Sequence, residues 1–231
     1  MIARCTAAVL FWLWIGGTAG YAQVRLAMPE LPRRGSVELG GGILWTGGFD
    51  LDGLPALLTS NDGNQAPPFT LFRTETRVGS VAGIQGRVGI FITPTVSLEG
   101  SVKYGRPIVT VQVSDDFEQA PALAVEQTMS RYMFDGSLLL HPRRWAMANG
   151  RGTPFVIVGA GYLRELHEGR ELVETGRSYH AGAGVKYWLT HGRRRLGLRG
   201  DALIVVRDGA YGGDVERRPH PALGATLSYL F

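Results

Sequence analysis

The sequence of 231 residues contains a single cysteine, Cys5, and lacks any apolar run long enough to cross a bilayer as a helix. A membrane-spanning helix needs about 20 consecutive apolar residues, so a polytopic helical membrane protein is excluded. One cysteine also excludes an internal disulfide and a cysteine-based zinc site. Charged residues make up only 19% of the chain and hydrophobic residues 45%, which is too apolar for a disordered protein.

The first 22 residues have the features of a secretory signal peptide. Arg4 gives a positive start, and residues 7–15 form a short apolar run that is followed by glycines. We expect cleavage between Ala22 and Gln23, and a retained N-terminal anchor is the alternative. Cleavage would remove Cys5 and with it any cysteine nucleophile. We expect residues 23–34, which include two prolines, to form a periplasmic tether, and residues 35–231 to form the folded domain.

Beyond residue 34, apolar residues alternate with small or polar residues in eight stretches. A period of two is typical of β-strands and not of helices. The stretches cover residues 37–45, 82–92, 96–104, 131–140, 156–165, 179–189, 196–207 and 223–231. Each has about ten residues, the length that a tilted strand needs to cross a bilayer. The pattern predicts an all-β fold: an eight-stranded antiparallel transmembrane β-barrel with up-and-down meander order.

One face of these stretches is apolar and carries aromatic residues near both ends. At the expected outer rim these are Trp45, Tyr104, Tyr132, Tyr162 and Tyr179, and at the inner rim Tyr187, Tyr229 and Phe231. Amphipathic aromatic rings prefer the depth of the lipid headgroups. We therefore expect these eight residues to form two aromatic girdles.

The opposite face carries five acidic and six basic residues. They are Glu38, Arg87, Glu99, Lys103, Arg131, Asp135, Glu165, Lys186, Arg199, Asp201 and Arg207. A soluble eight-stranded barrel would be apolar inside and polar outside, so this arrangement is inverted. Unpaired buried charges are costly, and the interior of eight strands is narrow. We expect these residues to form a charge network that plugs the lumen or leaves at most a narrow water path.

The connections between the stretches are sorted by charge. The shorter connections, 93–95, 142–153 and 190–195, contain no acidic residue and six arginines: Arg143, Arg144, Arg151, Arg193, Arg194 and Arg195. Most acidic residues fall in the longer connections, which we assign to the cell surface. The longest, 46–81, contains apolar segments at 51–58 and 69–72, for which we predict an apolar tip or small lid. A basic inner rim suits anionic phospholipid headgroups, so the net charge of +4 does not indicate nucleic-acid binding.

The ordered set of these features resembles the small outer-membrane β-barrel proteins of Gram-negative bacteria, of the OmpA-barrel, OmpX and OmpW type. The likeness covers roughly residues 35–231 and includes residues 154–162, 182–187 and 198–201. The chain also ends in Ser228-Tyr229-Leu230-Phe231, which is similar to the assembly signal of that family. The resemblance implies that Tyr229 and Phe231 are recognised by the barrel assembly machinery and that the barrel contacts outer-membrane lipid and lipopolysaccharide.

The sequence contains little that points to catalysis. It has no phosphate-binding loop, no His-Glu-x-x-His helix and no cluster of metal ligands. Ser178 and His180 have the spacing of a lipid deacylase pair in reversed order, and their parity points them into the lumen. We therefore predict no catalytic residue, no metal and no cofactor. We expect a role in envelope integrity or in binding an extracellular ligand through the outer loops. The alternatives are a narrow channel for ions or small hydrophobic solutes, and an envelope-lipid-modifying enzyme.

Overall fold

The computed structural model describes residues 32–58, 69–114, 121–167, 173–208 and 219–231, and most of them lie in β-strands. The strands of these residues are β1 Val37–Thr46, β2 Phe49–Leu58, β3 Phe69–Val78, β4 Val81–Thr93, β5 Val96–Gly105, β6 Ile108–Ser114, β7 Leu123–Thr128, β8 Ser130–Leu140, β9 Gly152–Leu166, β10 Val173–Trp188, β11 Arg195–Asp208 and β12 Pro219–Leu230. Two short 3-10 turns, Arg143–Trp145 and Ala148–Gly150, lie between β8 and β9. No helix among these residues is long and apolar enough to cross a membrane.

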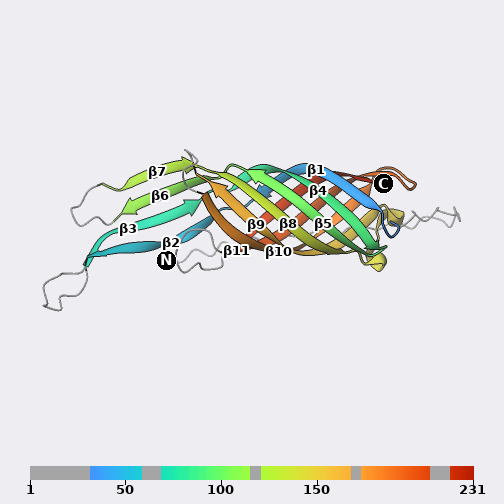
Figure 1. Cartoon of the computed structure of the whole chain (residues 1–231), viewed down its shortest axis with the longest axis horizontal. Helices are drawn as coiled ribbons and strands as arrows, with labels where there is room; N and C mark the ends of the chain where they lie inside the picture. Colours follow the sequence, from blue (N-terminus) through green and yellow to red (C-terminus); the bar gives the residue numbers. More distant parts are fainter. Residues whose placement is uncertain (1–31, 59–68, 115–120, 168–172, 209–218) are drawn as a thin grey trace, which may run out of the picture.

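Eight of the strands form a closed antiparallel barrel in the order β1-β12-β11-β10-β9-β8-β5-β4 (Figure 1). Every barrel strand pairs with the next barrel strand along the chain, and β1 pairs with both β4 and β12 to close the wall. The backbone N–H of Phe231 donates to the carbonyl of Val37 at 2.8 Å and extends this closing pair. The predicted all-β fold, an eight-stranded barrel with meander order, is confirmed.

Successive side chains in the barrel wall point alternately outward and inward, as the pleat of a strand requires. In β1, for example, Leu39, Ile43 and Trp45 are exposed on the outer surface, whereas Glu38 and Leu44 are buried inside. The outward side chains are mainly apolar, and Ile43 is 66% exposed. The sequence period of two therefore reports directly on which side of the wall each residue lies.

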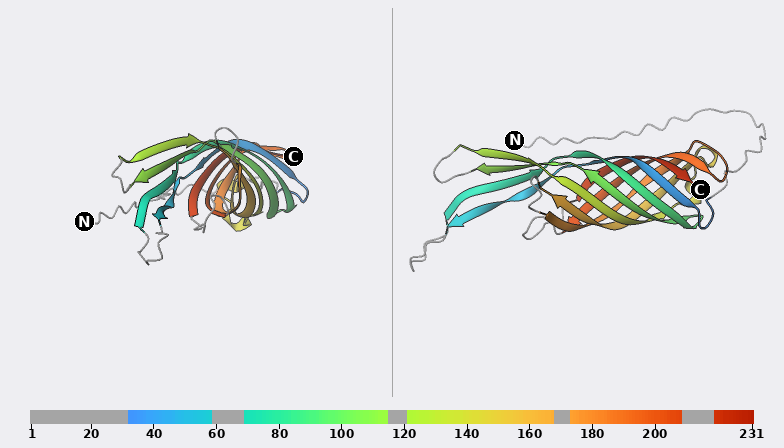
Figure 2. Two further views of the ribbon diagram at one scale, coloured as in Figure 1. Left: turned by 60° about the vertical axis from the view of Figure 1, so that its left-hand side comes forward. Right: turned by 45° about the horizontal axis from the view of Figure 1, so that its top comes forward.

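The other four strands form a second sheet, which we call the outer sheet, in the order β2-β3-β6-β7. It consists of two hairpins that project from one end of the barrel, while the C-terminus lies at the other end (Figures 1 and 2). The segments 51–58 and 69–72, for which an apolar tip or small lid is predicted, are paired strands of this sheet. Their residues, LDGLPALL and FTLF, do not alternate regularly between apolar and polar side chains, so the period of two does not mark them as strands.

Short breaks separate the barrel strands from the outer sheet. Gly47 and Gly48 lie between β1 and β2, where the backbones approach closely: a Cβ atom on Gly48 would lie 2.6 Å from the carbonyl oxygen of Val78. Pro107, between β5 and β6, accepts a hydrogen bond from the N–H of Met129 at 3.1 Å. The sheet is thus tied to the barrel at the base of both hairpins.

The predicted leader, residues 1–22, and its cleavage site at Ala22 and Gln23 lie outside the described residues, as does most of the predicted tether. Of that tether, residues 32–34 precede a tight turn. Ser36 donates its N–H to the carbonyl of Arg33 at 3.0 Å, and Gly35 donates to Phe91 at 2.7 Å. Gly35 has a φ of 84°, a left-handed conformation that glycine adopts at little cost. This turn is therefore fixed to the end of β4.

The close approach of β1 and β12 gives a first prediction. A Cβ atom on the inward-facing Gly42 would lie 2.0 Å from the carbonyl oxygen of Ala225 on the neighbouring strand, whereas on the outward-facing Gly41 it would meet only one atom, at 3.9 Å. We expect Gly42→Ala to lower the free energy of unfolding by about 1–3 kcal/mol, because the backbone of β12 must move. Gly41→Ala is the matched control and is expected to leave it unchanged. Urea unfolding in lipid vesicles measures both, and equal stability of the two variants would contradict the packing described here.

Candidate functional site

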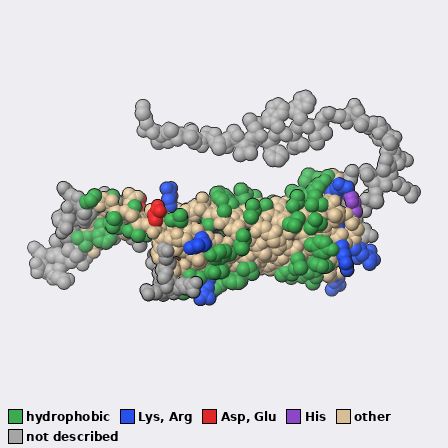
Figure 3. Space-filling view, turned by 90° about the horizontal axis from the view of Figure 1, so that it is seen from above, with side chains coloured by type: hydrophobic (Ala, Val, Ile, Leu, Met, Phe, Trp, Pro, Cys, Tyr) green, Lys and Arg blue, Asp and Glu red, His purple; other side chains and the backbone are tan. Residues whose placement is uncertain are grey.

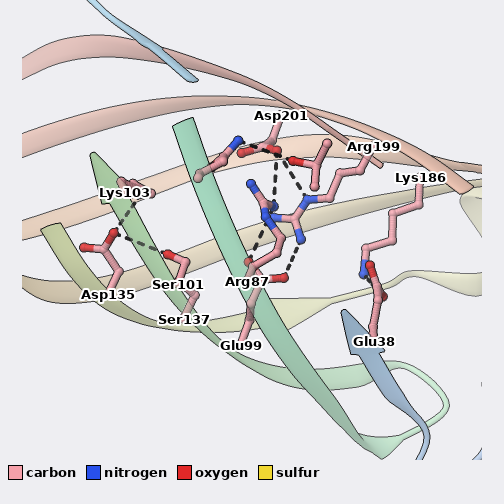
Figure 4. A network of polar contacts seen from close by, with 12 residues as sticks. Glu38, Arg87, Glu99, Ser101, Lys103, Asp135, Ser137, Lys186, Arg199 and Asp201 are labelled. Carbon is pink, nitrogen blue, oxygen red and sulfur yellow. Dashed lines mark hydrogen bonds and ion pairs between the residues drawn. The ribbon is translucent and has the colours of Figure 1, made fainter. Parts of the chain in front are cut away.

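The structure places all eleven charged residues predicted for the lumen inside the barrel, most of them drawn in Figure 4. None of them is more than 8% exposed. Each one takes part in at least one ion pair with another member: Glu38, Arg87, Glu99, Lys103, Arg131, Asp135, Glu165, Lys186, Arg199, Asp201 and Arg207. Mutual pairing offsets the cost of their burial, because a lone buried charge loses roughly several kcal/mol of hydration free energy.

The centre of the lumen holds a cluster of four charges from three strands. The guanidinium of Arg87 on β4 lies 3.5 Å from a carboxylate oxygen of Glu99 on β5 and 3.5 Å from one of Asp201 on β11. Arg199 on β11 donates to Glu99 and, through Nε, lies 3.3 Å from Asp201. These contacts link strands that are far apart around the barrel wall (Figure 4).

A second group lies nearer the outer sheet. Lys103 Nζ is 2.8 Å from Asp135 Oδ2, and Ser178 Oγ donates to the other carboxylate oxygen of Asp135 at 3.2 Å. Arg131 donates to Glu165, and Arg207 lies 3.7 Å from the same carboxylate. Arg131 and Arg207 thus share the buried carboxylate of Glu165.

At the opposite end of the lumen, Lys186 Nζ lies 2.6 Å from Glu38 Oε2. The same ammonium group is 5.4 Å from the ring centre of Phe91 and 5.7 Å from that of Phe155, within range of a cation–π attraction. These inward aromatic residues are not among the predicted site residues. The signal was present, since Phe91 has the same parity as Arg87 and Phe155 the same parity as Glu165.

His141 follows β8 in the inner turn and packs between the rings of Phe91 and Phe155, at centroid distances of 5.3 and 5.8 Å. Burial, together with the nearby positive charge of Lys186, lowers the pKa of His141 to about 3. The imidazole is therefore neutral at physiological pH. Rings and ion pairs together fill this end of the lumen, where Phe91, Trp188 and Leu230 form a buried apolar cluster.

The eight residues predicted as aromatic girdles all have the outward parity of the wall. Trp45, Tyr162, Tyr179, Tyr187 and Phe231 are exposed, and Tyr104, Tyr132 and Tyr229 are half-buried. The Tyr104 and Tyr132 rings lie 5.0 Å apart toward the outer sheet, and the Tyr229 and Phe231 rings 4.7 Å apart toward the other end. Figure 3 shows hydrophobic side chains along the wall, with lysines and arginines at its two ends. The girdle role itself stays a prediction.

The outer sheet has one apolar and one polar face. Strand pairing puts Val111 and Val125 opposite each other, and Val113 opposite Leu123. Leu123 is 62% exposed and Val125 53%, so this face offers apolar side chains to its surroundings. The other face carries polar residues such as Glu75 and Gln112, and an exposed ion pair of 2.7 Å between Arg77 and Asp50.

The apolar face of the sheet continues into the mouth of the barrel. Val78, Val109 and Met129 form a buried cluster there, with Phe49 and Val111 packed against it. The Phe49 ring lies 5.4 Å from that of His220 and 5.1 Å from the guanidinium carbon of Arg207. Phe49 therefore connects the base of the outer sheet to the charged lumen.

The serine and histidine considered for catalysis do not contact each other through their side chains. Ser178 donates to Asp135, and His180 Nε2 lies 2.9 Å from Ser137 Oγ. Both residues are buried and face the lumen, away from the outward wall, where a lipid deacylase would need them. Among the described residues there is no group of three metal-ligating side chains.

No protein-family model and no curated protein sequence matches the chain. Among solved structures, the outer membrane protein OprG from Pseudomonas aeruginosa aligns over 87% of this chain and 97% of its own, with 12% identity and a TM-score of 0.52. The N-terminal β-barrel domain of Pseudomonas aeruginosa OprF covers 86% and 98%, with 14% identity and a TM-score of 0.40. Ail of Yersinia pestis covers 86% and 99%, with 11% identity and a TM-score of 0.41. The likeness to OprG is one of fold: this chain has the fold of a small outer-membrane barrel.

The central cluster gives a second prediction. Replacing Arg199 by alanine removes the partner of Glu99 and Asp201, and leaves both carboxylates to share Arg87. Removing one side of a buried ion pair costs about 3–5 kcal/mol, so we expect Arg199→Ala to lower the free energy of unfolding in lipid vesicles by that amount. Arg144→Ala, on an exposed inner turn, is the control and should have no effect. A stable Arg199→Ala barrel would show that the cluster contributes nothing.

Proposed function

We propose that this chain is a non-enzymatic barrel of a bacterial outer membrane that is closed along its lumen and acts at the cell surface through its outer sheet. The apolar outward wall supports the membrane placement. Ile43, Ile84, Val88, Val158 and Ile204 are all exposed on it. Water penalises such a surface and the lipid core favours it, provided that the strands close into a barrel with no free edge.

The connections support an orientation with the outer sheet at the cell surface. Outer-membrane barrels have short turns on the periplasmic side and long connections outside. The connections at the sheet end of this barrel include the hairpins β2-β3 and β6-β7, whereas those at the other end are turns. The aromatic girdles and the recognition of Tyr229 and Phe231 by the assembly machinery are consistent with this orientation and are part of the proposal.

The apolar face of the outer sheet is the observation that carries a surface role. Contiguous apolar side chains that project into water mark interaction sites. β7 is also the last strand of its sheet, so its outer backbone edge has no partner strand among the described residues. A free edge beside an apolar face suits an extended protein segment that adds as a further strand and lays alternate apolar side chains on that face. We propose such a segment of an extracellular partner as the ligand.

A second candidate is the capture of small hydrophobic solutes. It is favoured by the continuity of the apolar face with the cluster of Val78, Val109 and Met129 at the barrel mouth. The ion pairs below that cluster oppose passage of an apolar molecule through the whole lumen. This candidate function therefore explains the apolar cluster at the barrel mouth but not the ion pairs in the interior.

A closed lumen has a direct electrical consequence. We expect the wild-type protein in planar lipid bilayers to show no stepwise conductance at high salt, because its interior is filled by buried ion pairs and rings. A general porin inserted under the same conditions provides the positive control. Large, steady conductance steps from this barrel would contradict the closed lumen.

The surface role is tested with a synthetic, lysine-flanked peptide of alternating valine and threonine that carries a fluorophore. We expect fluorescence polarisation to report binding to the wild-type barrel in lipid nanodiscs. Val125→Asp should weaken binding by about tenfold, because it places a charge on the apolar face. Ala124→Asp introduces the same charge on the opposite face of β7 and is the matched control.

Equal weakening by Val125→Asp and Ala124→Asp would contradict docking on the apolar face. Displacement of the peptide by a small apolar dye, with no change of either affinity in these variants, would favour the solute candidate instead.

A further inference from the structure

At the inner end of the barrel, three segments far apart in the sequence surround one cavity of about 260 Å³. They are the turn before β1, the β10–β11 turn and the C-terminus. Its lining includes Arg33, Arg34, Arg193, Arg195, Leu230 and Phe231. Four arginines thus line a pocket whose remaining side chains are mainly apolar. We propose that this pocket binds the phosphate headgroup of an anionic phospholipid of the inner leaflet.

Each arginine-bearing segment is held in place by hydrogen bonds. The turn of Arg33 and Arg34 is fixed through Gly35 and Ser36, as described above, and the Ser36 hydroxyl accepts from the N–H of Arg33 at 3.1 Å. In the β10–β11 turn, Arg195 Nε donates to the carbonyl of Gly192 at 2.7 Å, and Leu196 donates to the Thr190 hydroxyl at 2.8 Å. A site that is already ordered loses little entropy when a ligand binds.

The charge of this pocket is complementary to a phosphate. The arginines converge from separate segments, and the described acidic residue nearest in sequence, Glu38, lies in the lumen beside Lys186. The C-terminal carboxylate of Phe231 offsets one positive charge, which leaves an excess of three among these groups. Guanidinium groups bind phosphate oxygens in paired, charge-assisted hydrogen bonds.

A phospholipid fits better than a free phosphate because the pocket joins the apolar wall. Phe231 lines the cavity and also packs edge-to-face against the outward-facing Tyr229. A headgroup among the arginines would therefore place its acyl chains beside two aromatic rings at the membrane surface. In the proposed orientation this end of the barrel lies at the periplasmic leaflet. Figure 3 shows lysines and arginines gathered at this end of the molecule.

The test uses the full barrel in nanodiscs that contain equal amounts of phosphatidylglycerol and phosphatidylethanolamine. Native mass spectrometry counts the lipids that remain bound when the barrel is released. We expect the wild type to retain phosphatidylglycerol selectively. The triple variant Arg33→Gln, Arg34→Gln, Arg193→Gln should lose about tenfold of that selectivity, because it removes three of the four guanidinium groups that line the pocket and would bind the phosphate.

The control variant Arg143→Gln, Arg144→Gln, Arg194→Gln also removes three positive charges from this end of the barrel, but none of these three arginines lines the pocket. We expect it to keep the selectivity of the wild type. Equal losses in the two triple variants, or no selectivity in the wild type, would overturn the proposal. Complete displacement of the lipid by millimolar inorganic phosphate would overturn the assignment to a phospholipid.

If the first triple variant does not fold, the single variants Arg193→Gln and Arg194→Gln provide the comparison, since they change neighbouring residues of one turn. Only Arg193→Gln should reduce the retention of phosphatidylglycerol. Failure of this pocket leaves the peptide-binding test of the outer sheet unaffected, because the two sites lie at opposite ends of the barrel.

Discussion

Closure of an eight-stranded wall is the constraint on which the rest of this structure depends. The pairing of β1 with β12 leaves no free edge in the barrel, so the backbone of every barrel strand is paired on both sides. A wall of eight strands encloses a space only wide enough for side chains. Any charge on its inner face must therefore find its partner among the other inward side chains. Glu38 and Lys186, 148 residues apart in the sequence, meet across the lumen for this reason.

The ion pairs in turn determine where the protein can interact with other molecules. Arg87, Glu99 and Arg199 tie β4 and β5 to β11, and the aromatic rings of Phe91 and Phe155 pack against the cations below. In the closed lumen that we propose, these groups bind one another, so ligand binding would be restricted to the two ends and the outward wall, where the outer sheet and the arginine pocket lie.

Period two in the sequence was sufficient to place the barrel strands and to sort their residues by side, because each inward residue is flanked by outward ones. Parity alone could not tell which charges meet, since the Glu38–Lys186 contact depends on the register of strands distant in the chain.

The outer sheet was missed for a different reason. Val109, Val111 and Val113 alternate as clearly as any barrel strand, but β6 and β7 have only seven and six residues and were assigned to loops. The arginine pocket cannot be predicted from the sequence, because three segments that are distant in the chain must come together to form it.

Between β5 and β6 the apolar and polar faces of the chain change sides. Along β5 the outward residues Leu98, Val102 and Tyr104 are apolar, and the inward residues Glu99 and Lys103 are charged. Past Ile108, which is apolar and still exposed on the outward side, the order reverses: the inward side carries Val109, Val111 and Val113, and the outward side Thr110, Gln112 and Ser114.

This reversal has a physical reason. In the proposed placement, the outer face of the barrel meets lipid within the bilayer, so polar groups must turn inward and pair. Beyond the bilayer the outer face meets water, and apolar side chains gain by turning toward the barrel axis. The apolar face above the mouth is therefore the continuation of the lumen wall without its ion pairs. Among the described residues no strand covers this face, and the partner segment that we propose would complete its burial.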